Sequence, residues 1–506
     1  MDFINPKKRQ YHKLQLIIGY VLISIMILLM ALILLYQARG YGFGKNGQII
    51  QNGLIYVSST PNPANITLNG VLNGATTNAR LELPAGQYKL ELSKTGYHPW
   101  IRIVDVDGGS VEYFEYPFLF PITVKTTVVQ QFSTQPTLFT QTPDQHWLLV
   151  QDPTNQNNFF DYDLSNPSKV VSSVTTLSLP DGMVTIPASG STQSWQVIGW
   201  SNDNQHVLLE HIYQGGQEYI LFDRITPANS INLTKSLNLN STTQLSLLDG
   251  KYDQYYLYDS AAATINSETL SGLQPTLVES HVLAYSSSGS STITYITSQN
   301  APTNVVNVDV LQGGTNSVIR QLPANSTYLL NSAKYAGNWY IAAAATTDNE
   351  VYVYKNPMSD IASNPSEPLV PAYILKVTAP NYLSFSDNFQ FIMAENGSAI
   401  AVYDSLTQKS YTYQLSYSIP ATQHAYWIND DLLYTTANNV VSVFDYDGTN
   451  QQTLQPSLSG SMVMFDSAYK WAYALTTTPT LSTSFQPITT LPYELTSTAL
   501  RIPADQ

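Results

Sequence analysis

Oxygen-rich loops are the first residues of this 506-residue chain whose types and spacing could do chemistry. Residues 445–450 read Asp-Tyr-Asp-Gly-Thr-Asn, so side-chain oxygens recur at the alternating spacing of short calcium loops. The distal glutamate that completes an EF-hand is missing, and Asp-Gly at the end of a strand is itself a strong hairpin pattern. We therefore interpret this loop, and the Asp-Val-Asp-Gly-Gly stretch at 105–109, as turns.

Three histidines, His146, His206 and His281, occupy similar positions just before expected strands. If these positions converged on one face, their imidazoles could bind a metal ion. However, a position that recurs in repeats usually does so for a structural reason, and no His-x-x-x-His or Glu-x-x-His pair accompanies it. We expect no metal and no cofactor, and we assign no residue as catalytic, cofactor-binding or metal-binding.

Carboxylates such as Asp430 and Asp431 are the remaining candidates for hydrolytic chemistry. The chain has no Gly-x-Ser-x-Gly elbow and no P-loop. Acids that line the channel of a ring-shaped fold could still act together, because no local motif would reveal them. Tyrosines could stack on sugars or peptides, but with 35 of them in the chain, sheet packing accounts for most.

An apolar run at residues 14–36 determines where such groups would act. It is about 23 residues long, or roughly 34 Å as a helix, which is enough to cross a hydrocarbon core of about 30 Å. A cleaved signal peptide would have an apolar region of about 7–15 residues and a small-x-small cleavage site, which the stretch at 36–41 does not offer. Cationic flanks stay in the cytoplasm, and the run follows four basic residues: Lys7, Lys8, Arg9 and Lys13. We expect a cytoplasmic N-terminus at 1–13, a single transmembrane helix at 14–36 and an extracellular body.

The composition of the body limits its partners. The net charge of the chain is −14, and the basic N-terminus leaves the remainder more acidic still. This acidity argues against a nucleic-acid partner and disfavours docking onto anionic lipid. Only 11% of residues are charged, whereas about 25% is typical of soluble domains. The chain is instead rich in Ser, Thr, Asn, Gln and Tyr, a composition that indicates a β-rich surface. The chain has no cysteine, which excludes disulfides and thiolate zinc sites.

Short alternating segments follow the anchor. Residues 37–53 are rich in Gly and Gln and are expected to form a flexible stalk. Between 54 and 118, five segments with period-two alternation predict a small antiparallel sandwich: 54–58, 64–68, 79–83, 88–93 and 100–106. Tyr97, Trp100 and Tyr113 could line a ligand face, but we expect these large aromatic residues in the core.

This segment resembles a PEGA domain, a small surface-associated β module of bacterial and archaeal proteins. The matching residues are Ser58 through Pro63, Ile-Thr-Leu-Asn-Gly at 66–70, Leu-Pro-Ala-Gly-Gln-Tyr at 83–88 and Lys-Thr-Gly-Tyr at 94–97. The turn that gives the family its name reads Pro-Ala-Gly here. The resemblance implies a binding or spacer role in the cell envelope and supplies no catalytic residues.

A polar turn that leads into an apolar strand recurs from about residue 126 onward. Clear copies lie at 142–149, 201–208, 386–392 and 466–472, with looser copies at 249–256, 279–285, 333–341 and 429–434. A second pattern is a strand that ends in an acid before a turn, as at Asp161, Asp223, Asp259, Asp309, Asp404 and Asp445. A period near 45 residues with several strands per unit is typical of a β-propeller, because blades packed in a ring bury faces that one blade alone would expose.

The turn-then-strand element resembles that of WD40-like and TolB-type propeller repeats. We expect a propeller of seven or eight blades at 120–495 and a C-terminal tail at 496–506. A strand before the first blade, at 111–120 or at 122–130, is expected to complete the last blade and close the ring.

The predicted fold is therefore mainly β, with an N-terminal transmembrane helix, a PEGA-like sandwich and a propeller. It indicates a membrane-anchored, non-enzymatic binding or scaffold protein of the cell envelope, which recognises a protein or glycan partner through loops at the ends of the ring. The alternative is an anchored hydrolase or lyase with carboxylates in the propeller channel. Two or three acids within about 5–10 Å of one another would favour this alternative.

Overall fold

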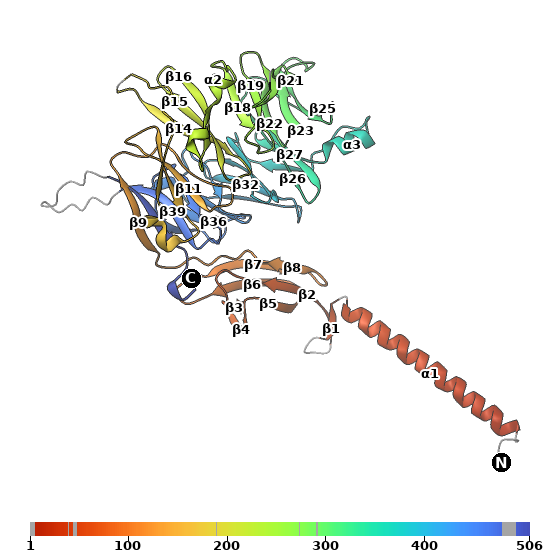
Figure 1. Cartoon of the computed structure of the whole chain (residues 1–506). Helices are drawn as coiled ribbons and strands as arrows, with labels where there is room; N and C mark the ends of the chain where they lie inside the picture. Colours follow the sequence, from red (N-terminus) through yellow and green to blue (C-terminus); the bar gives the residue numbers. More distant parts are fainter. Residues whose placement is uncertain are drawn as a thin grey trace. The chain divides into compact units, whose positions relative to one another are not determined.

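The computed structural model describes residues 6–38, 40–43, 48–188, 190–272, 274–289, 292–477 and 492–505. Its first element is the 33-residue helix α1 (Pro6–Ala38), shown in Figure 1. The span from Tyr11 to Ala38 contains an 18-residue stretch with a mean hydropathy of 3.0, and its apolar side chains are exposed rather than packed against the rest of the described chain. The helix therefore has the length and composition to cross a membrane.

The chain divides after Thr123 into two compact units, and the first is a sandwich of two four-stranded sheets. One sheet has the order β1 (Tyr41–Phe43), β2 (Ile49–Val57), β5 (Ala79–Pro84), and β8 (Val111–Phe114) pairs with β2 in parallel. The other has the order β4 (Val71–Thr76), β3 (Asn65–Leu68), β6 (Gly86–Ser93), β7 (Trp100–Val106). Alternate residues of both sheets fill the core, including Ile55, Leu81, Leu90, Trp100 and Phe114.

This unit differs from the sequence-based expectation in three respects. Residues 37–53, expected as a flexible stalk, contain β1 and the first part of β2, which pair with each other. The strand β8 is parallel to its neighbour, although an antiparallel sandwich was expected. Tyr97 and Trp100 are buried as predicted, but Tyr113 is 60% exposed because it alternates along β8 with Phe114, which takes the core side.

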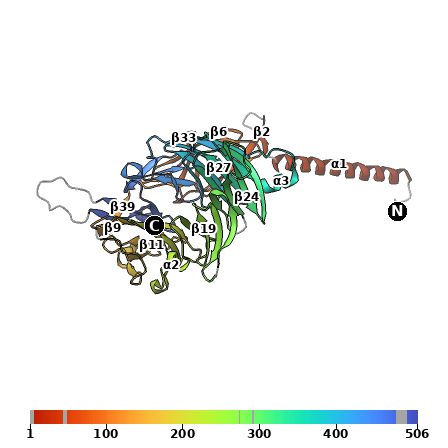
Figure 2. The same ribbon diagram turned by 90° about the horizontal axis from the view of Figure 1, so that it is seen from above.

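Within its described residues, the second unit contains eight four-stranded antiparallel sheets, which form the blades of a propeller (Figure 2). Blades 1 to 4 are β10 (Phe139–Gln141), β11 (Trp147–Gln151), β12 (Asn158–Asp163), β13 (Thr175–Ser178); β14 (Gln193–Trp200), β15 (His206–Tyr213), β16 (Gly216–Asp223), β17 (Ile231–Asn232); β18 (Thr243–Leu247), β19 (Gln254–Asp259), β20 (Thr264–Thr269), β21 (Thr276–Ser280); and β22 (Val282–Ser287), β23 (Thr292–Thr297), β24 (Val305–Gln312), β25 (Thr315–Pro323). Blades 5 to 8 are β26 (Tyr328–Tyr335), β27 (Asn338–Ala345), β28 (Glu350–Lys355), β29 (Tyr373–Lys376); β30 (Tyr382–Phe385), β31 (Phe391–Asn396), β32 (Ala399–Asp404), β33 (Lys409–Gln414); β34 (Tyr426–Trp427), β35 (Leu432–Thr435), β36 (Val440–Asp445), β37 (Gln452–Pro456); and β38 (Val463–Phe465), β39 (Trp471–Thr477), β40 (Tyr493–Ala499), β9 (Lys125–Phe132).

The last blade takes its outer strand from the beginning of the unit. The strand β9 pairs antiparallel with β40, from Lys125 opposite Ala499 to Phe132 opposite Tyr493. Of the two closing strands considered from the sequence, 122–130 is confirmed, whereas 111–120 contains β8 of the first unit. Because β40 continues to Ala499, residues 496–499 belong to the ring and not to a C-terminal tail.

Hydrophobic cores lie between successive blades. The core that joins the last blade to the first contains Val129 and Phe132 of β9, Leu148 and Val150 of β11, and Tyr473 of β39. A blade shares its faces with two neighbours, so its middle strands are apolar on both sides: all residues from Tyr340 to Ala345 of β27 are buried. Closure by β9 therefore gives every blade a packed face on each side.

One copy of each sequence pattern does not occupy the same place in its blade as the other copies. The copy at 279–285 spans the connection from β21 to β22, which links blade 3 to blade 4. Asp259 ends β19, the second strand of its blade, whereas Asp161, Asp223, Asp404 and Asp445 lie on third strands. Acidic residues cap hairpins at both ends of a blade, so the pattern indicates the repeat without fixing its phase.

Candidate functional site

Four of the turns between the first and second strands of a blade share one conformation. They are the clear turns of the sequence repeat, at 142–145, 201–204, 386–389 and 466–469. In each, the N–H of the fourth residue donates to the carbonyl oxygen of the first at 2.8 to 3.1 Å. The fourth residue has a positive φ of 49° to 65°: Gln145, Asn204, Phe389 and Tyr469. The repeated polar sequence therefore encodes a repeated turn.

A carboxylate or amide oxygen within each turn accepts main-chain N–H groups of the residues that follow. Asp203 Oδ1 accepts from Gln205 and His206 at 2.9 and 3.0 Å, and Asp144 Oδ1 accepts from His146 at 3.1 Å. Burial acts to raise the pKa of Asp203, but hydrogen bonds from His206 and Gln205 outweigh it and hold this pKa below its ordinary value. Asp and Asn recur in these turns because they satisfy the backbone locally.

Turns of neighbouring blades contact one another around one end of the ring, which we call the turn end. The Asp144 N–H donates to Asn204 Oδ1 at 3.0 Å, which joins blades 1 and 2. Gln145 Nε2 of blade 1 lies 3.5 Å from the Tyr469 hydroxyl oxygen of blade 8. The Tyr335 hydroxyl of blade 5 donates to Gln390 Oε1 of blade 6 at 3.3 Å. At the turn end, contacts between turns therefore join blade 1 to blades 2 and 8, and blade 5 to blade 6.

A group of acids and tyrosines from blades 5 to 8 lies on the turn end. We call it the turn face, and its members are Tyr335, Asp387, Asp430, Asp431 and Tyr469. Asp387 is exposed to water but closely surrounded by protein, and this partial desolvation together with the charge of Asp430 raises its pKa to about 6. Burial also raises the pKa of Tyr335 and of Tyr469, and neighbouring carboxylates add to the effect.

Only part of the turn face was predicted from the sequence. Asp430 and Asp431 were considered as an acid pair, and the structure places them on the loop that precedes β35. Asp387 was missed as a partner of Asp430, although it lies in one of the clear repeat turns. The Asn388 backbone N–H donates to Asp430, so the turn of blade 6 holds the acid of blade 7.

The three histidines considered as metal ligands do not converge. His146 and His206 are at the turn end, where their Nδ1 atoms lie 3.3 Å from Asp144 and 2.6 Å from Asp203. His281 precedes β22, a first strand, and so lies at the opposite end of its blade. Among the described residues, no group of three His, Asp or Glu side chains is arranged to hold a metal ion.

The two oxygen-rich loops form turns. In the 445–450 loop, the Asp445 N–H donates to the Thr449 carbonyl at 3.0 Å, and Asn450 Nδ2 donates to Asp445 Oδ2 at 2.8 Å. Thr449 Oγ1 donates to Asp447 Oδ1 at 2.7 Å. The side-chain oxygens thus accept donors from their own loop. Residues 105–109 likewise connect β7 to β8.

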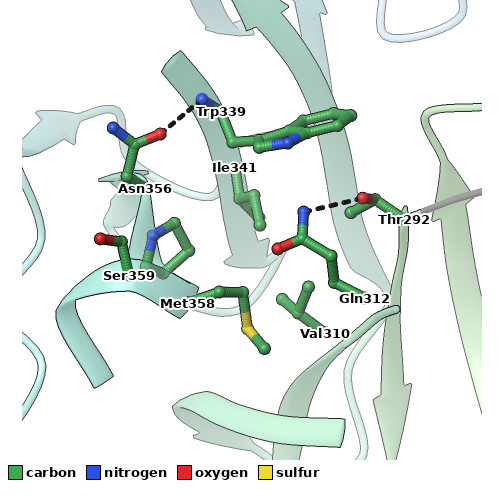
Figure 3. A pocket seen from close by; sticks show the side chains of 9 residues that line it. Thr292, Val310, Gln312, Trp339, Ile341, Asn356, Met358 and Ser359 are labelled. Carbon is green, nitrogen blue, oxygen red and sulfur yellow. Dashed lines mark hydrogen bonds between the residues drawn. The ribbon is translucent and has the colours of Figure 1, made fainter. Parts of the chain in front are cut away.

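A small pocket of about 70 Å³ lies between blades 4 and 5, and we call it the Trp339 pocket (Figure 3). Trp339 lies at the start of β27 and pairs with Lys334, next to Tyr335 at the end of β26, so the pocket belongs to the turn end. Most of the exposed lining is apolar. The lining residues are Thr292, Val310, Gln312, Trp339, Ile341, Asn356, Pro357, Met358 and Ser359.

Two hydrogen bonds arrange the polar groups of the Trp339 pocket. Gln312 Nε2 donates to Thr292 Oγ1 at 3.0 Å, and this leaves the Gln312 carbonyl oxygen pointing into the pocket (Figure 3). The Trp339 backbone N–H donates to Asn356 Oδ1 at 2.8 Å, which holds the residue before α3 (Pro357–Ser363) against β27. Met358 of α3 lies across the pocket from the indole (Figure 3). The pocket thus offers an apolar surface with one amide acceptor.

Comparison with known protein families identifies the first unit. The model of the PEGA domain family matches residues 52–118, which cover β2 through β8. Residues 52–118 are a PEGA domain. The match covers a minor part of the chain, and its boundaries agree with the sandwich described above.

The propeller is similar to many solved structures at low sequence identity. The structure of the Dos1 propeller is 12% identical, covers 74% of this chain and 94% of its own, and has a TM-score of 0.45. An oligogalacturonate lyase in complex with manganese is 11% identical, covers 74% of this chain and 100% of its own, and has a TM-score of 0.40. Comparison with curated proteins gives no match. The propeller assignment rests on the eight blades and their closure by β9.

Proposed function

We propose that this chain is a membrane-anchored binding protein of the cell envelope, and that its propeller recognises a protein partner at the turn end. The helix α1 is the anchor, and the body lies outside the cytoplasm. The PEGA domain and the propeller both support a binding or scaffold role in general terms. A ring of packed blades is a rigid support for recognition by its loops.

The Trp339 pocket is the observation that carries this proposal. Its volume of about 70 Å³ is roughly half that of a cavity that admits benzene, so it suits one aliphatic side chain of a partner. Val310, Ile341 and Met358 would contact that side chain, and the Gln312 carbonyl oxygen would accept a main-chain N–H of the same segment. A pocket whose exposed lining is mostly apolar fits a side chain of a peptide segment better than a glycan, whose hydroxyls need many polar partners.

The alternative, an anchored hydrolase or lyase, is supported by one observation. Asp387 and Asp430 come from successive blades, and both carboxylates have a pKa above the ordinary value because of burial. A carboxyl group whose pKa is raised toward neutral pH can act as a general acid. Turnover of a glycan or peptide panel by the full chain, lost in Asp387→Asn, would establish this alternative.

Site-specific photocrosslinking tests the binding proposal. A photoreactive residue replaces Met358 in the full chain in its own membrane, and a matched probe replaces Leu283, which is exposed at the opposite end of blade 4. We expect a discrete protein adduct from position 358 alone, retained in Trp339→Phe and lost in Trp339→Ala. Equal adducts from both positions, or an adduct that persists in Trp339→Ala, would contradict the proposal. Glycan binding without a protein adduct would contradict the protein partner and indicate a glycan as the ligand.

A further inference from the structure

The outer face of the first PEGA sheet carries an apolar and aromatic patch. We call it the proximal patch, and it consists of Leu54 and Tyr56 on β2 with Val111 and Tyr113 on β8. These residues pair side by side, Leu54 with Val111 and Tyr56 with Tyr113, and the two tyrosine rings stack with centroids 5.1 Å apart. Val111 and Tyr113 are 45% and 60% exposed. In a described chain whose large apolar residues are mostly buried, this patch requires an explanation.

The patch lies next to the end of α1. The Asn52 N–H donates to the Gly40 carbonyl oxygen at 2.6 Å, only two residues after the helix ends at Ala38. Gly40 has a φ of 76°, and a Cβ there would lie 2.3 Å from the Asn52 carbonyl oxygen and 3.4 Å from Gly109 Cα. Only glycine permits this close approach. The chain that leaves α1 is therefore bonded to the middle of β2 and packed against the turn before β8.

Distances along β2 keep the patch close to the segment that follows α1. Leu54 is two residues beyond Asn52 and Tyr56 four, or about 7 and 14 Å at a rise of about 3.4 Å per residue. The headgroup layer adds about 5–8 Å to each side of the hydrocarbon core. A patch this close to the end of a transmembrane helix reaches the headgroup layer when the sheet lies against the membrane.

The chemistry of the patch fits that layer. Tyrosine is enriched at membrane interfaces because its ring is apolar and its hydroxyl remains hydrated. The neighbouring outward residues on β5 are Arg80 and Glu82, which pair with Tyr56 and Leu54 and balance each other's charge. A neutral patch does not need anionic lipid, which agrees with the acidity of the body. The helix also keeps the patch at a high local concentration beside the bilayer, so a small apolar area is sufficient.

We infer that the proximal patch rests in the headgroup layer of the bilayer and holds the PEGA domain against the membrane. This inference depends on the proposed anchoring by α1. The PEGA domain would then lie at a defined height above the membrane, and it would not move freely on a flexible stalk.

Spin labelling of the full chain in phosphatidylcholine nanodiscs tests the inference. The chain has no cysteine, so single cysteines can be introduced at Val111, at Leu29 inside α1, and at Ile103, which is 56% exposed on the outer face of the other PEGA sheet. Collisions of each nitroxide with oxygen and with a water-soluble nickel complex report its depth. We expect the label at 111 to collide with nickel several times less often than the label at 103, and the label at 29 to be fully protected.

Each outcome bears on one claim. An exposed label at 29 would show that α1 is not in the bilayer, which would overturn the anchoring itself. A protected label at 29 with equal exposure at 103 and 111 would overturn the membrane contact of the patch alone. Protection at 111 that persists in Tyr56→Ser/Tyr113→Ser would show that the tether and not the patch brings the domain to the lipid, and this would also overturn the inference. Its loss in that variant would establish it.

Discussion

The guanidinium of Arg224, just after the third strand of blade 2, donates to the Asp161 carboxylate of blade 1 at 2.9 Å. Both side chains are almost completely buried, and the guanidinium also lies 4.2 Å from the centroid of the Trp147 ring. Burial raises the pKa of Asp161 to about 6, although Arg224 acts to lower it. A buried ion pair thus links two blades at the turn end.

Replacement of Arg224 should destabilise the propeller in a pH-dependent way. Arg224→Met leaves a buried carboxylate unpaired, which costs about 3–5 kcal/mol of the free energy of unfolding at pH 7. The folded-state pKa of Asp161 then rises further above its unfolded value. The loss is therefore greatest above this raised pKa, shrinks as the pH falls toward about 6, and levels off below it, where Asp161 is protonated in both folded proteins. Denaturant unfolding at pH 7 and pH 5 measures both effects.

Lys376→Met is the matched control. The ion pair of Lys376 with Glu350 lies on the surface, so its removal should cost less than about 1 kcal/mol. Equal losses in the two variants, or a loss in Arg224→Met that does not change with pH, would contradict the account of the Arg224 pair.

Ring closure by β9 should depend on one buried aromatic side chain. Phe132 is 4% exposed in the core between the last and first blades, so Phe132→Ala should lower the free energy of unfolding of the propeller by about 3–5 kcal/mol. Hydrogen exchange of β40 should accelerate because β9 supplies its outer hydrogen bonds. Val128→Ala, on the same strand but 42% exposed, should leave both quantities nearly unchanged. Unchanged exchange of β40 in Phe132→Ala would show that β9 does not close the ring.

The pKa of Asp387 should respond to the neighbouring blade. We expect its carboxyl group to titrate at about 6, and Asp430→Asn should lower this pKa because it removes a like charge. Carbon-13 NMR of selectively labelled aspartate measures the titration. Asp203→Asn, in the turn of blade 2, serves as the control and should not shift it. An Asp387 that titrates at the ordinary value in the unmodified chain would contradict the described turn face.

His424 should stabilise a buried glutamate. Its Nδ1 lies 2.7 Å from the fully buried Glu395, and its ring stacks on Tyr382 at 4.1 Å. His424→Phe keeps the stack and removes this partner, so the free energy of unfolding should fall by about 1–3 kcal/mol at pH 7. Burial raises the pKa of Glu395, so protonation in the folded state should reduce the loss at lower pH.

A second variant separates the charge from the packing. Glu395→Gln in the His424→Phe background removes the buried charge and should recover part of the lost stability. If denaturant unfolding shows no recovery, the stacking geometry and not the His424–Glu395 pair accounts for the effect.

Features encoded in neighbouring residues were predictable from the sequence. The turns at 142–145 and 201–204 recur because Asp144 and Asp203 accept the N–H groups of residues that follow them directly, so the pattern is visible in a short stretch. The apolar helix α1 and the PEGA strands are likewise encoded in local runs of apolar or alternating residues. The number of blades was left at seven or eight, because it depends on the pairing of β9 with β40.

Features that need distant segments to meet were not predictable. The charge of Asp430 acts on Asp387 only because successive blades pack, and nothing near either residue in the sequence indicates its partner. The parallel β8 has only four residues, which is too short for a clear period. The contact of Gly40 with Asn52 was not predicted, because a stretch rich in glycine indicates a flexible segment. This glycine is instead required by the close approach of the Asn52 carbonyl oxygen.

Labelling of intact cells tests the central claim most directly, because a binding face outside the cytoplasm requires α1 to anchor and export the body. One single-cysteine variant carries the thiol at Lys251, exposed in the propeller, and another at His12, just before the apolar run. A membrane-impermeant maleimide should label position 251 in intact cells and position 12 only after permeabilisation. Protection of position 251 until the cells are lysed, or labelling of position 12 in intact cells, would contradict the account.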